Sequence, residues 1–338
     1  MKDIGVMAAV MLMAMVSAAS ASSVDTFGTD GNQFTIDFVT ISGATNPTSG
    51  IPAGSGFDFT GVNNDYRMGI CEVTYDQWNK FTTSLGVPVT GHPYYGYDTD
   101  PYYTGSNAPA TGVSWYEAAQ FVNWLNTSTG HPAAYNFTGT QGTSDYTFAT
   151  WSAAEADNGT NLYRHKDAFY YLPTENEWVK AAYWNGTTLQ AYATKPGDTL
   201  HQGDGTSGTG WNYYDNGDAY DTDSPWDVGS GSEELNGTFD MMGNVWDWVE
   251  SPYSVTSYEV ASDRVRRGGT WATDSYVTGL PSTARYDSSS PTYVTFGLGF
   301  RVASESPAAV VPEPLTIMSA LIGLGMIGGY ARKRRATC

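Results

Sequence analysis

The chain of 338 residues is poor in cysteine and histidine. It has two cysteines, and because Cys338 is the last residue, the body of the chain holds only Cys71 and cannot form an internal disulfide. Cys71 lies in an apolar stretch (MGICEV), which indicates a buried small hydrophobe rather than a nucleophile. The four histidines show no metal-ligand spacing, so we expect no histidine metal site.

Cations are also scarce. Lysine and arginine total 16 against 35 aspartates and glutamates, which gives a formal net charge of −19. Such a surface repels phosphate backbones and anionic lipid headgroups, so we expect no nucleic-acid partner. The acidity favours solubility and the binding of cations.

Long hydrophobic runs occur only at the two ends. The N-terminal run covers residues 4–16, follows Lys2, and precedes Ala19-Ser20-Ala21. This is the pattern of a secretory signal, so we interpret residues 1–21 as a signal peptide cleaved near Ala21–Ser22. An uncleaved membrane anchor is the alternative, although the run is short for one.

The C-terminal run covers residues 315–330, between Pro-Glu-Pro at 312–314 and four cations at 332–335. As a helix it would span roughly 24 Å, the lower limit for a bilayer core, and the cations would stay on the cytoplasmic side. This order resembles the PEP-CTERM sorting signal of Gram-negative bacteria. The resemblance implies recognition by exosortase-type machinery and a link to exopolysaccharide or biofilm matrix; a plain single-span anchor is the alternative.

These ends set the predicted organisation. Residues 1–21 are the signal peptide, 22–303 one domain, 304–311 a linker, and 312–338 the sorting signal with a short transmembrane helix. We therefore expect export across the inner membrane to the periplasm, the outer surface or the extracellular matrix. Contact with the membrane would be transient and would run only through the C-terminal helix before processing.

Within the domain, two-residue alternation predicts a strand at Phe34–Ile41, and residues 66–73, 264–271 and 296–303 are also strand-like. Residues 46–56 are rich in Gly, Pro and Ser, and residues 186–236 lack a sustained period, so both predict loops. Helices are expected after Thr74, Ser114 and Thr174, because each opens a helical pattern and the last two begin capping boxes.

Six motifs follow in order through this domain. They are EVTYDQWNKF (72–81), ATGVSWYEAAQF (110–121), YLPTENEW (171–178), FDMMGNVWDW (239–248), RGGTW (267–271) and GFR (299–301). This series resembles the formylglycine-generating enzyme (sulfatase-modifying factor) domain over residues 33–303. The resemblance implies an α+β fold, a decorated C-type-lectin-like fold with much irregular loop. Physically, the tryptophans behind the capping boxes predict buried rings, and Arg301 predicts a bidentate pair with a buried carboxylate or with carbonyls.

The signature activity of that family is the oxidation of a sulfatase cysteine to formylglycine, with copper held by two enzyme cysteines. Those positions fall at Thr273 and at Val277 or Thr278, and none is a cysteine. Because thiolates are the soft ligands that select Cu(I), we expect no copper and no catalytic residue of this type.

The resemblance implies calcium instead. A first family site maps to the side chains of Asp240 and Asp247 and the carbonyls of Gly243 and Val245, with Asp247 where the family has Glu. A second site maps loosely to Asn212, Tyr213, Asp218 and Tyr220. Carboxylates and carbonyls suit this hard cation, and a solvated acidic loop is the alternative.

Two classes of function remain open. The first is a non-catalytic binding or matrix protein that contacts polysaccharide through aromatic side chains, with Tyr94, Tyr95, Tyr97 and Trp271 as candidate contacts. The loop that carries the tyrosines, residues 92–103, could equally be a plug over the core. The second is an oxidoreductase of the formylglycine-generating type with a departed mechanism.

Overall fold

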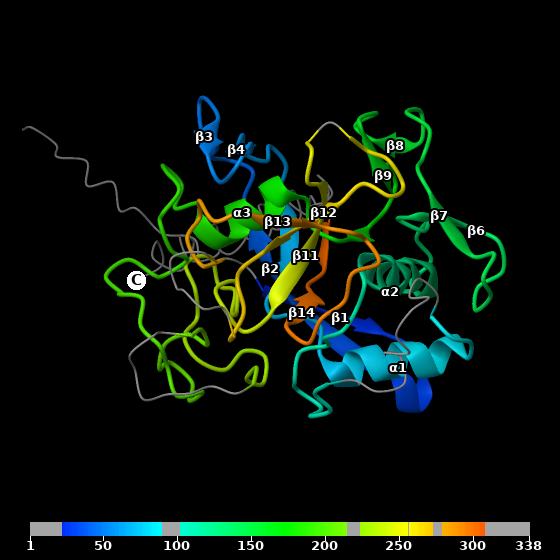
Figure 1. The fold of residues 1–338 in the computed structure, drawn as a ribbon, viewed down its shortest axis with the longest axis horizontal. Helices are drawn as coiled ribbons and strands as arrows, with labels where there is room; N and C mark the ends of the chain where they lie inside the picture. Colours follow the sequence, from blue (N-terminus) through cyan, green and yellow to red (C-terminus); the bar gives the residue numbers. More distant parts are fainter. Residues whose placement is uncertain (1–21, 90–101, 215–223, 256, 273–278, 308–338) are drawn as a thin grey trace, which may run out of the picture. The chain divides into compact units, whose positions relative to one another are not determined.

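The computed structural model describes residues 22–89, 102–214, 224–255, 257–272 and 279–307, and for residues 286–288 it describes the backbone alone. The chain divides after Glu305 into two units, and the helices and strands described below belong to the first. The predicted signal peptide and sorting signal lie outside the described residues. Within the described residues, no helix combines the length and the hydropathy needed to cross a membrane. The first unit mixes helices, sheets and long irregular segments (Figure 1), so the predicted α+β class is confirmed.

Capping boxes start all three α-helices of the described residues. The helices are α1 (Tyr75–Leu85), α2 (Trp115–Ser128) and α3 (Glu175–Tyr183). At α2, the Ser114 hydroxyl accepts from the Glu117 N–H at 3.3 Å, and the Glu117 carboxylate accepts from the Ser114 N–H at 2.7 Å. Each box satisfies backbone donors that a helix start leaves free. The boxes of α2 and α3 were predicted, and the one of α1 uses a glutamine in place of the glutamate.

The larger sheet separates two hydrophobic cores. Its strands, in spatial order and all antiparallel, are β1 (Ser22–Phe27), β2 (Phe34–Ile41), β5 (Tyr66–Gly69), β15 (Ala303–Glu305) and β10 (Tyr170–Tyr171). On β2, Phe34, Ile36 and Phe38 join the first core. Val39 and Ile41 of the same strand join the second core. Because neighbouring residues of a strand point to opposite faces, β2 contributes to both cores.

The second sheet carries the most conspicuous motifs. Its spatial order is β13 (Tyr286–Ser289), β12 (Arg264–Arg267), β11 (Trp246–Pro252) and β14 (Leu298–Phe300), with β11 and β14 parallel. Along β11, Trp246 and Trp248 enter the first core and Val249 enters the second.

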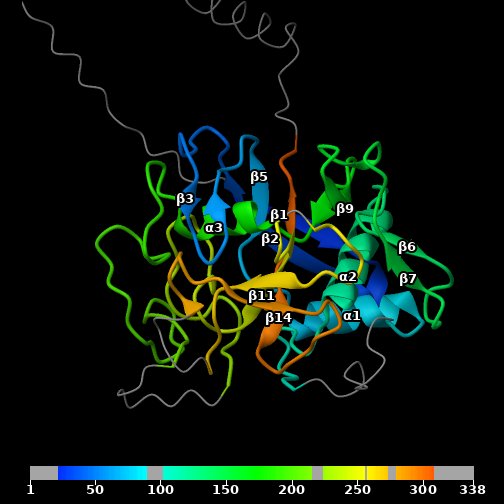
Figure 2. The ribbon, with the colours of Figure 1, turned by 45° about the horizontal axis from the view of Figure 1, so that its top comes forward.

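Short elements complete the described part of the unit. They are a 3₁₀ turn, η1 (Asp30–Asn32), and three hairpins, β3 (Ile51–Pro52) with β4 (Asp58–Phe59), β6 (Asn136–Thr138) with β7 (Thr147–Ala149), and β8 (Ala156–Asp157) with β9 (Asn161–His165). Figure 2 shows α1 and α2 side by side, with β6 and β7 beyond α2.

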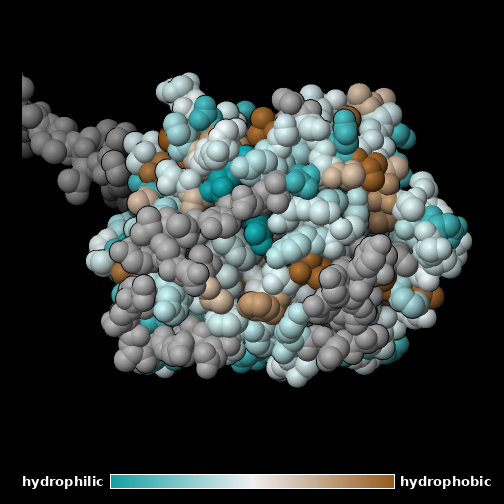
Figure 3. Space-filling model, viewed as in Figure 1, coloured by the Kyte–Doolittle hydropathy of each residue, from teal (hydrophilic) through white to brown (hydrophobic). Residues whose placement is uncertain are grey.

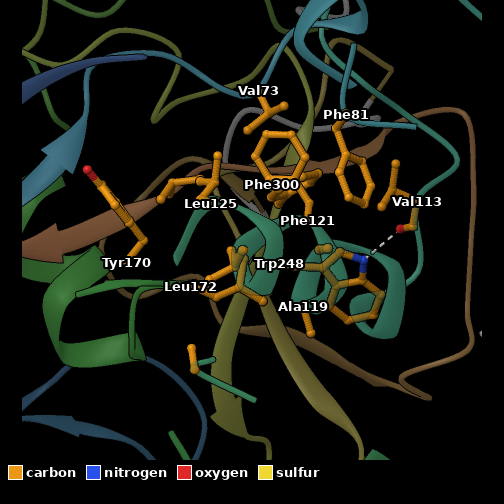
Figure 4. Packing of buried hydrophobic residues seen from close by; sticks show 14 of the residues in the cluster. Val73, Phe81, Val113, Ala119, Phe121, Leu125, Tyr170, Leu172, Trp248 and Phe300 are labelled. Carbon is orange, nitrogen blue, oxygen red and sulfur yellow. Dashed lines mark hydrogen bonds between the residues drawn. The ribbon is translucent and has the colours of Figure 1, made fainter. Parts of the chain in front are cut away.

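The first core fills the space around α1 and α2. Phe121 of α2 and Phe300 of β14 meet edge to face at 5.4 Å, and Trp248 donates from its ring N–H to the Val113 carbonyl at 2.9 Å (Figure 4). The second core lies against α3, where Trp178 is fully buried. The tryptophans of the helix motifs are thus buried, as the sequence predicts.

Some of the predicted boundaries are wrong. The strand predicted at 66–73 ends at Gly69, and the one predicted at 264–271 ends at Arg267. Residues 296–303 form parts of two strands in different sheets rather than one, because the chain passes from one sheet to the other at Arg301. The last strand continues to Glu305, so residues 304–305 belong to the sheet and not to a linker.

We expect Ser114→Ala to lower the free energy of unfolding by about 1 kcal/mol, because a buried helix start loses its cap. Ser128→Ala, at the other end of α2, removes a hydroxyl without removing a cap and serves as control. Urea unfolding followed by tryptophan fluorescence measures both. Equal midpoints for the two variants would contradict the capping role.

Candidate functional site

The RGGTW motif forms a tight turn after β12. Gly268 and Gly269 have φ of 102° and 82°, and a Cβ on Gly268 would lie 3.1 Å from the Met241 carbonyl oxygen. The left-handed backbone and the close approach both require glycine. The Trp271 N–H donates to the Asn244 carbonyl at 2.9 Å, so the turn is docked on the GNVW segment.

Asn244 is the buried hub beneath this turn. Its side-chain oxygen accepts from the Trp226 N–H at 2.8 Å and from the Asn212 amide at 3.1 Å. Its amide nitrogen lies 3.3 Å from both oxygens of Glu72 and donates to that carboxylate. Its φ of 54° is left-handed, a strained shape that these contacts maintain.

An ion pair between Asp247 and Arg301 lies on the α3 side of β11. The Arg301 Nε donates to Asp247 Oδ2 at 2.6 Å, and the Trp178 ring N–H donates to the same oxygen at 2.9 Å. The remaining Arg301 nitrogens donate to the carbonyls of Gly69, Ile70 and Phe239. Arg301 therefore has both kinds of partner predicted for it, a carboxylate and carbonyls, but its pair with Asp247 runs through Nε alone and is not the predicted bidentate pair.

Carboxylates outnumber cations around Arg301. Burial, with the neighbouring Asp240 as the next cause, raises the pKa of Glu72 well above its usual range. Burial also raises the pKa of Asp240 to about 6 and that of Glu234 to about 8. One guanidinium is not enough to keep this whole acid set ionised, so protons or a cation must balance it.

Above the hub, aromatic side chains reach the surface. We call the rings of Tyr102, Trp271 and Phe296, together with Tyr293 three residues before Phe296 in the chain, the aromatic patch. Tyr102, Tyr293 and Phe296 are 44%, 43% and 43% exposed, and Trp271 is partly exposed. The Phe296 ring lies 5.9 Å from both the Tyr102 ring and the Trp271 ring. The patch is joined to β11 by the Trp246 N–H, which donates to the Gly297 carbonyl.

Exposed apolar residues are otherwise dispersed. On the face drawn in Figure 3, hydrophobic residues form small separate areas within a mostly hydrophilic surface. A cleft of about 1210 Å³ lies between the end of β2 and α3 and includes Lys180, Trp184 and Lys195, but none of the predicted site residues.

Cys71 lines a cavity of about 190 Å³ beside the start of α1. Its side chain is partly buried, whereas the sequence predicts full burial. Burial nevertheless raises the pKa of its thiol well above the usual range, and nearby Asp240 and Glu72 raise it further. The thiolate is therefore disfavoured, and the absence of a nucleophilic role for Cys71 stays a prediction.

The model of the sulfatase-modifying factor enzyme 1-like domain matches residues 58–306, more than half of the chain. The chain belongs to this family. No curated protein matches it.

Solved structures with the same fold support the architecture of this family member. Treponema denticola variable protein 1 aligns with a TM-score of 0.55 and 21% identity, over 84% of this chain and 99% of that one. CarF aligns with a TM-score of 0.53 and 20% identity, over 80% of this chain and 99% of that one. PvdO from Pseudomonas aeruginosa aligns with a TM-score of 0.52 and 17% identity, over 83% of this chain and 98% of that one. The α+β, C-type-lectin-like fold with few helices and much loop is confirmed.

The residues predicted for the first calcium site only partly suit a cation. Asp240 Oδ2 accepts from the Gly229 N–H at 2.7 Å, and Asp247 Oδ2 accepts from Arg301 and Trp178. Asp247 Oδ1, however, is buried without a hydrogen-bond partner. Among the described side chains, no group of three or more Asp, Glu, His or Cys residues is placed to hold a metal.

The residues predicted for the second calcium site adjoin those predicted for the first. A Cβ on Gly243 would lie 2.0 Å from the Asn212 carbonyl oxygen, so the two segments touch. Asn212 Oδ1 is a second buried oxygen without a partner, while the Tyr213 carbonyl accepts from the Gln202 amide. A cation bound here would draw on both sets, and calcium stays a prediction.

Several predicted residues lie outside the described part of the chain. They are Asp218 and Tyr220 of the second set, the tyrosines Tyr94, Tyr95 and Tyr97, and the positions Thr273, Val277 and Thr278. Of the predicted contacts, Trp271 is described and lies in the aromatic patch.

Sequence reasoning missed Phe296 and Tyr293 as surface residues and missed Glu72 as the partner of Asn244. The strand-like pattern at 296–303 does not indicate that Phe296 is exposed, as it is in the structure. The EVTYDQW motif places Glu72 directly before a helix start, but nothing in its spacing links it to a segment 172 positions away.

We expect Asp247→Ala to lower the free energy of unfolding by about 3–5 kcal/mol, because it leaves the Arg301 guanidinium buried and unpaired. Asp76→Ala removes the exposed pair with Lys80 and should cost less than about 0.5 kcal/mol. Both are measured by thermal and urea unfolding, with calcium and with a chelator. If the loss in Asp247→Ala vanished under chelation, the carboxylate would be a calcium ligand rather than the partner of Arg301.

Glu234 gives a pH-dependent prediction. Its folded pKa of about 8 lies above the unfolded value of about 4.3, so the folded state keeps a proton that the unfolded chain has lost. The contribution of Glu234 to the free energy of unfolding is therefore full below the unfolded pKa and falls as the pH rises towards 8. Glutamine does not titrate, so Glu234→Gln avoids this loss of stability. We expect the difference in unfolding midpoint, variant minus unmodified chain, to rise between about pH 5 and about pH 8. Asp58→Asn, at an exposed acid, controls for the loss of a surface charge, and an unchanged difference would contradict the shift.

Proposed function

We propose that the chain is an exported, non-catalytic binding protein that holds a polysaccharide on the aromatic patch. The observation that carries this proposal is the exposure of Tyr102 and Phe296 in contact with each other, beside the turn that fixes Trp271. Soluble domains expose clustered aromatic rings mainly where they bind something.

The order beneath the patch supports this role. The Trp271 backbone is held by the Asn244 carbonyl, and Asn244 is in turn held by Glu72 and Asn212. A surface that is ordered before binding loses little conformational entropy when the ligand arrives. Aromatic rings held in this way can stack on the apolar faces of pyranose rings. Because these faces are only weakly hydrophobic, they favour a surface that is ordered before the sugar binds.

The sequence favours binding over oxidation. Apart from Cys71 and the terminal Cys338 the chain has no thiol, so no cysteine pair can follow the RGGTW motif. Copper-dependent formylglycine formation needs such a pair. Consumption of oxygen with a cysteine-containing sulfatase peptide and added copper would favour the oxidoreductase alternative.

The remaining parts of the proposal concern location and partners. The signal peptide would direct export, and the C-terminal segment would be recognised by exosortase-type machinery that delivers the domain to a polysaccharide-rich surface or matrix. Calcium would be a structural ion next to Asp247 and Asn212, where two buried oxygens lack partners.

We expect Phe296→Ala to weaken the binding of extracellular polysaccharide about tenfold, because one stacked ring contributes roughly 1–1.5 kcal/mol. The measurement is a polysaccharide pull-down followed by titration calorimetry on a glycan that is retained. Tyr146→Ala is the matched control, since Tyr146 stacks on Phe137 at 5.1 Å in the β6–β7 hairpin. Equal loss in both variants, or none in Phe296→Ala, would exclude the patch.

A further inference from the structure

Arg266 of β12 lies beside the aromatic patch. Its guanidinium carbon is 5.4 Å from the centre of the Trp246 ring and 5.5 Å from the centre of the Tyr293 ring. Two aromatic faces therefore fix the side chain in place and leave it partly exposed. Tyr293 lies three residues before Phe296, and the Trp246 N–H donates to the Gly297 carbonyl, so the cation adjoins the segment that carries Phe296.

This guanidinium differs from the others in the described part of the chain. The others have oxygen partners: Arg67 pairs with Asp25, Arg164 with Glu177 and Glu250, Arg267 and Arg285 with Glu175, Arg301 with Asp247, and Arg264 binds the carbonyls of Val260 and Ser262. Arg266 has no ion pair with any described residue, and its Nε is buried without a hydrogen-bond partner.

The missing partner is informative because the chain is acidic. With 35 acidic residues in the sequence, carboxylates for pairing are plentiful, and the buried arginines are paired with them or with carbonyls. Within the described part of the chain, only rings hold this guanidinium. Its two terminal nitrogens, unlike the buried Nε, can therefore donate to a planar or tetrahedral oxyanion. A second donor in the patch, the Trp271 ring N–H, is also buried without a partner.

We propose that the saccharide bound at the patch carries an oxyanion, a carboxylate or a sulfate on the sugar ring, and that Arg266 receives it. This inference rests on the proposed function. The aromatic rings hold the sugar whatever its charge, and Arg266 selects the charged one. Arg266 is thus a specificity-determining residue, and the patch alone provides the affinity for neutral sugars.

An acidic peptide is a weaker candidate for the same surface. Among the described residues, Arg266 is the cation in contact with Trp246 and Tyr293. A peptide with several carboxylates would meet one guanidinium and the repulsion of a chain with net charge −19. A sugar ring that stacks on the aromatic side chains and carries one charged group matches a surface with one cation, Arg266, beside several aromatic rings.

The test compares three oligosaccharides of equal length by calorimetry on the full chain: a neutral glucan, an oligouronate and a sulfated glucan. The unmodified chain should bind at least one charged oligomer about tenfold more tightly than the neutral one, and the preferred one identifies the oxyanion. Arg266→Gln should reduce this preference to less than about twofold and leave the affinity for the neutral glucan unchanged. Arg266→Lys keeps the charge without the fork and should retain an intermediate preference.

The outcomes separate the two proposals. Phe296→Ala should weaken all three saccharides together, because it removes the platform and not the selection. Equal affinity for neutral and charged oligomers, or a preference that survives in a folded Arg266→Gln chain, would overturn the role of Arg266 and leave the proposed function intact. Failure to bind any saccharide would overturn both, and tighter binding of polyglutamate than of the oligouronate would replace the sugar by an acidic peptide. Thermal melting confirms that each variant is folded.

Discussion

The fold depends on one buried ion pair, Asp247 with Arg301. The carboxylate comes from β11 in the smaller sheet, and the guanidinium follows β14 at the point where the chain leaves that sheet for the larger one. Trp178 of α3 donates to the same carboxylate, and the carbonyls of Gly69 and Ile70, at the end of β5, accept from the guanidinium. Removing two charges from water is costly, and the hydrogen bonds that Trp178 donates to the carboxylate and that Arg301 donates to backbone carbonyls offset part of this cost. Both sheets and α3 therefore depend on the same few atoms.

The order of the exposed surface comes from this buried arrangement. β11 presents its tryptophans to the first core and Asp247 to Trp178 of the second, so the strand is fixed from both sides. Asn244, just before β11, is held by Glu72 and in turn holds the RGGTW turn. The aromatic patch is thus the outermost layer of a series of contacts that begins in the core. A domain with few regular elements can in this way present a rigid surface.

Patterns among neighbouring residues made part of the fold predictable from the sequence. The capping boxes at Ser114 and Thr174 define two helix starts, and the alternation of β2 matches its bounds, because these features depend on neighbouring residues. β11 escaped prediction because it is buried on both faces and shows no alternation in its burial. The patch escaped for a different reason, since Phe296 and Tyr102 come together from segments far apart in the sequence and only the folded chain places them in contact. Trp271 was predicted because a family motif marks it.

The position of β15 has a consequence for how the protein is made. This strand is the last described element of the domain, yet it lies inside the larger sheet, between β5 and β10. Until residues 303–305 have emerged from the ribosome, β5 and β10 each have an unpaired edge where β15 will later insert. The domain therefore closes only when its final residues are released, and a chain halted shortly before them would expose two strand edges that can pair with neighbouring chains.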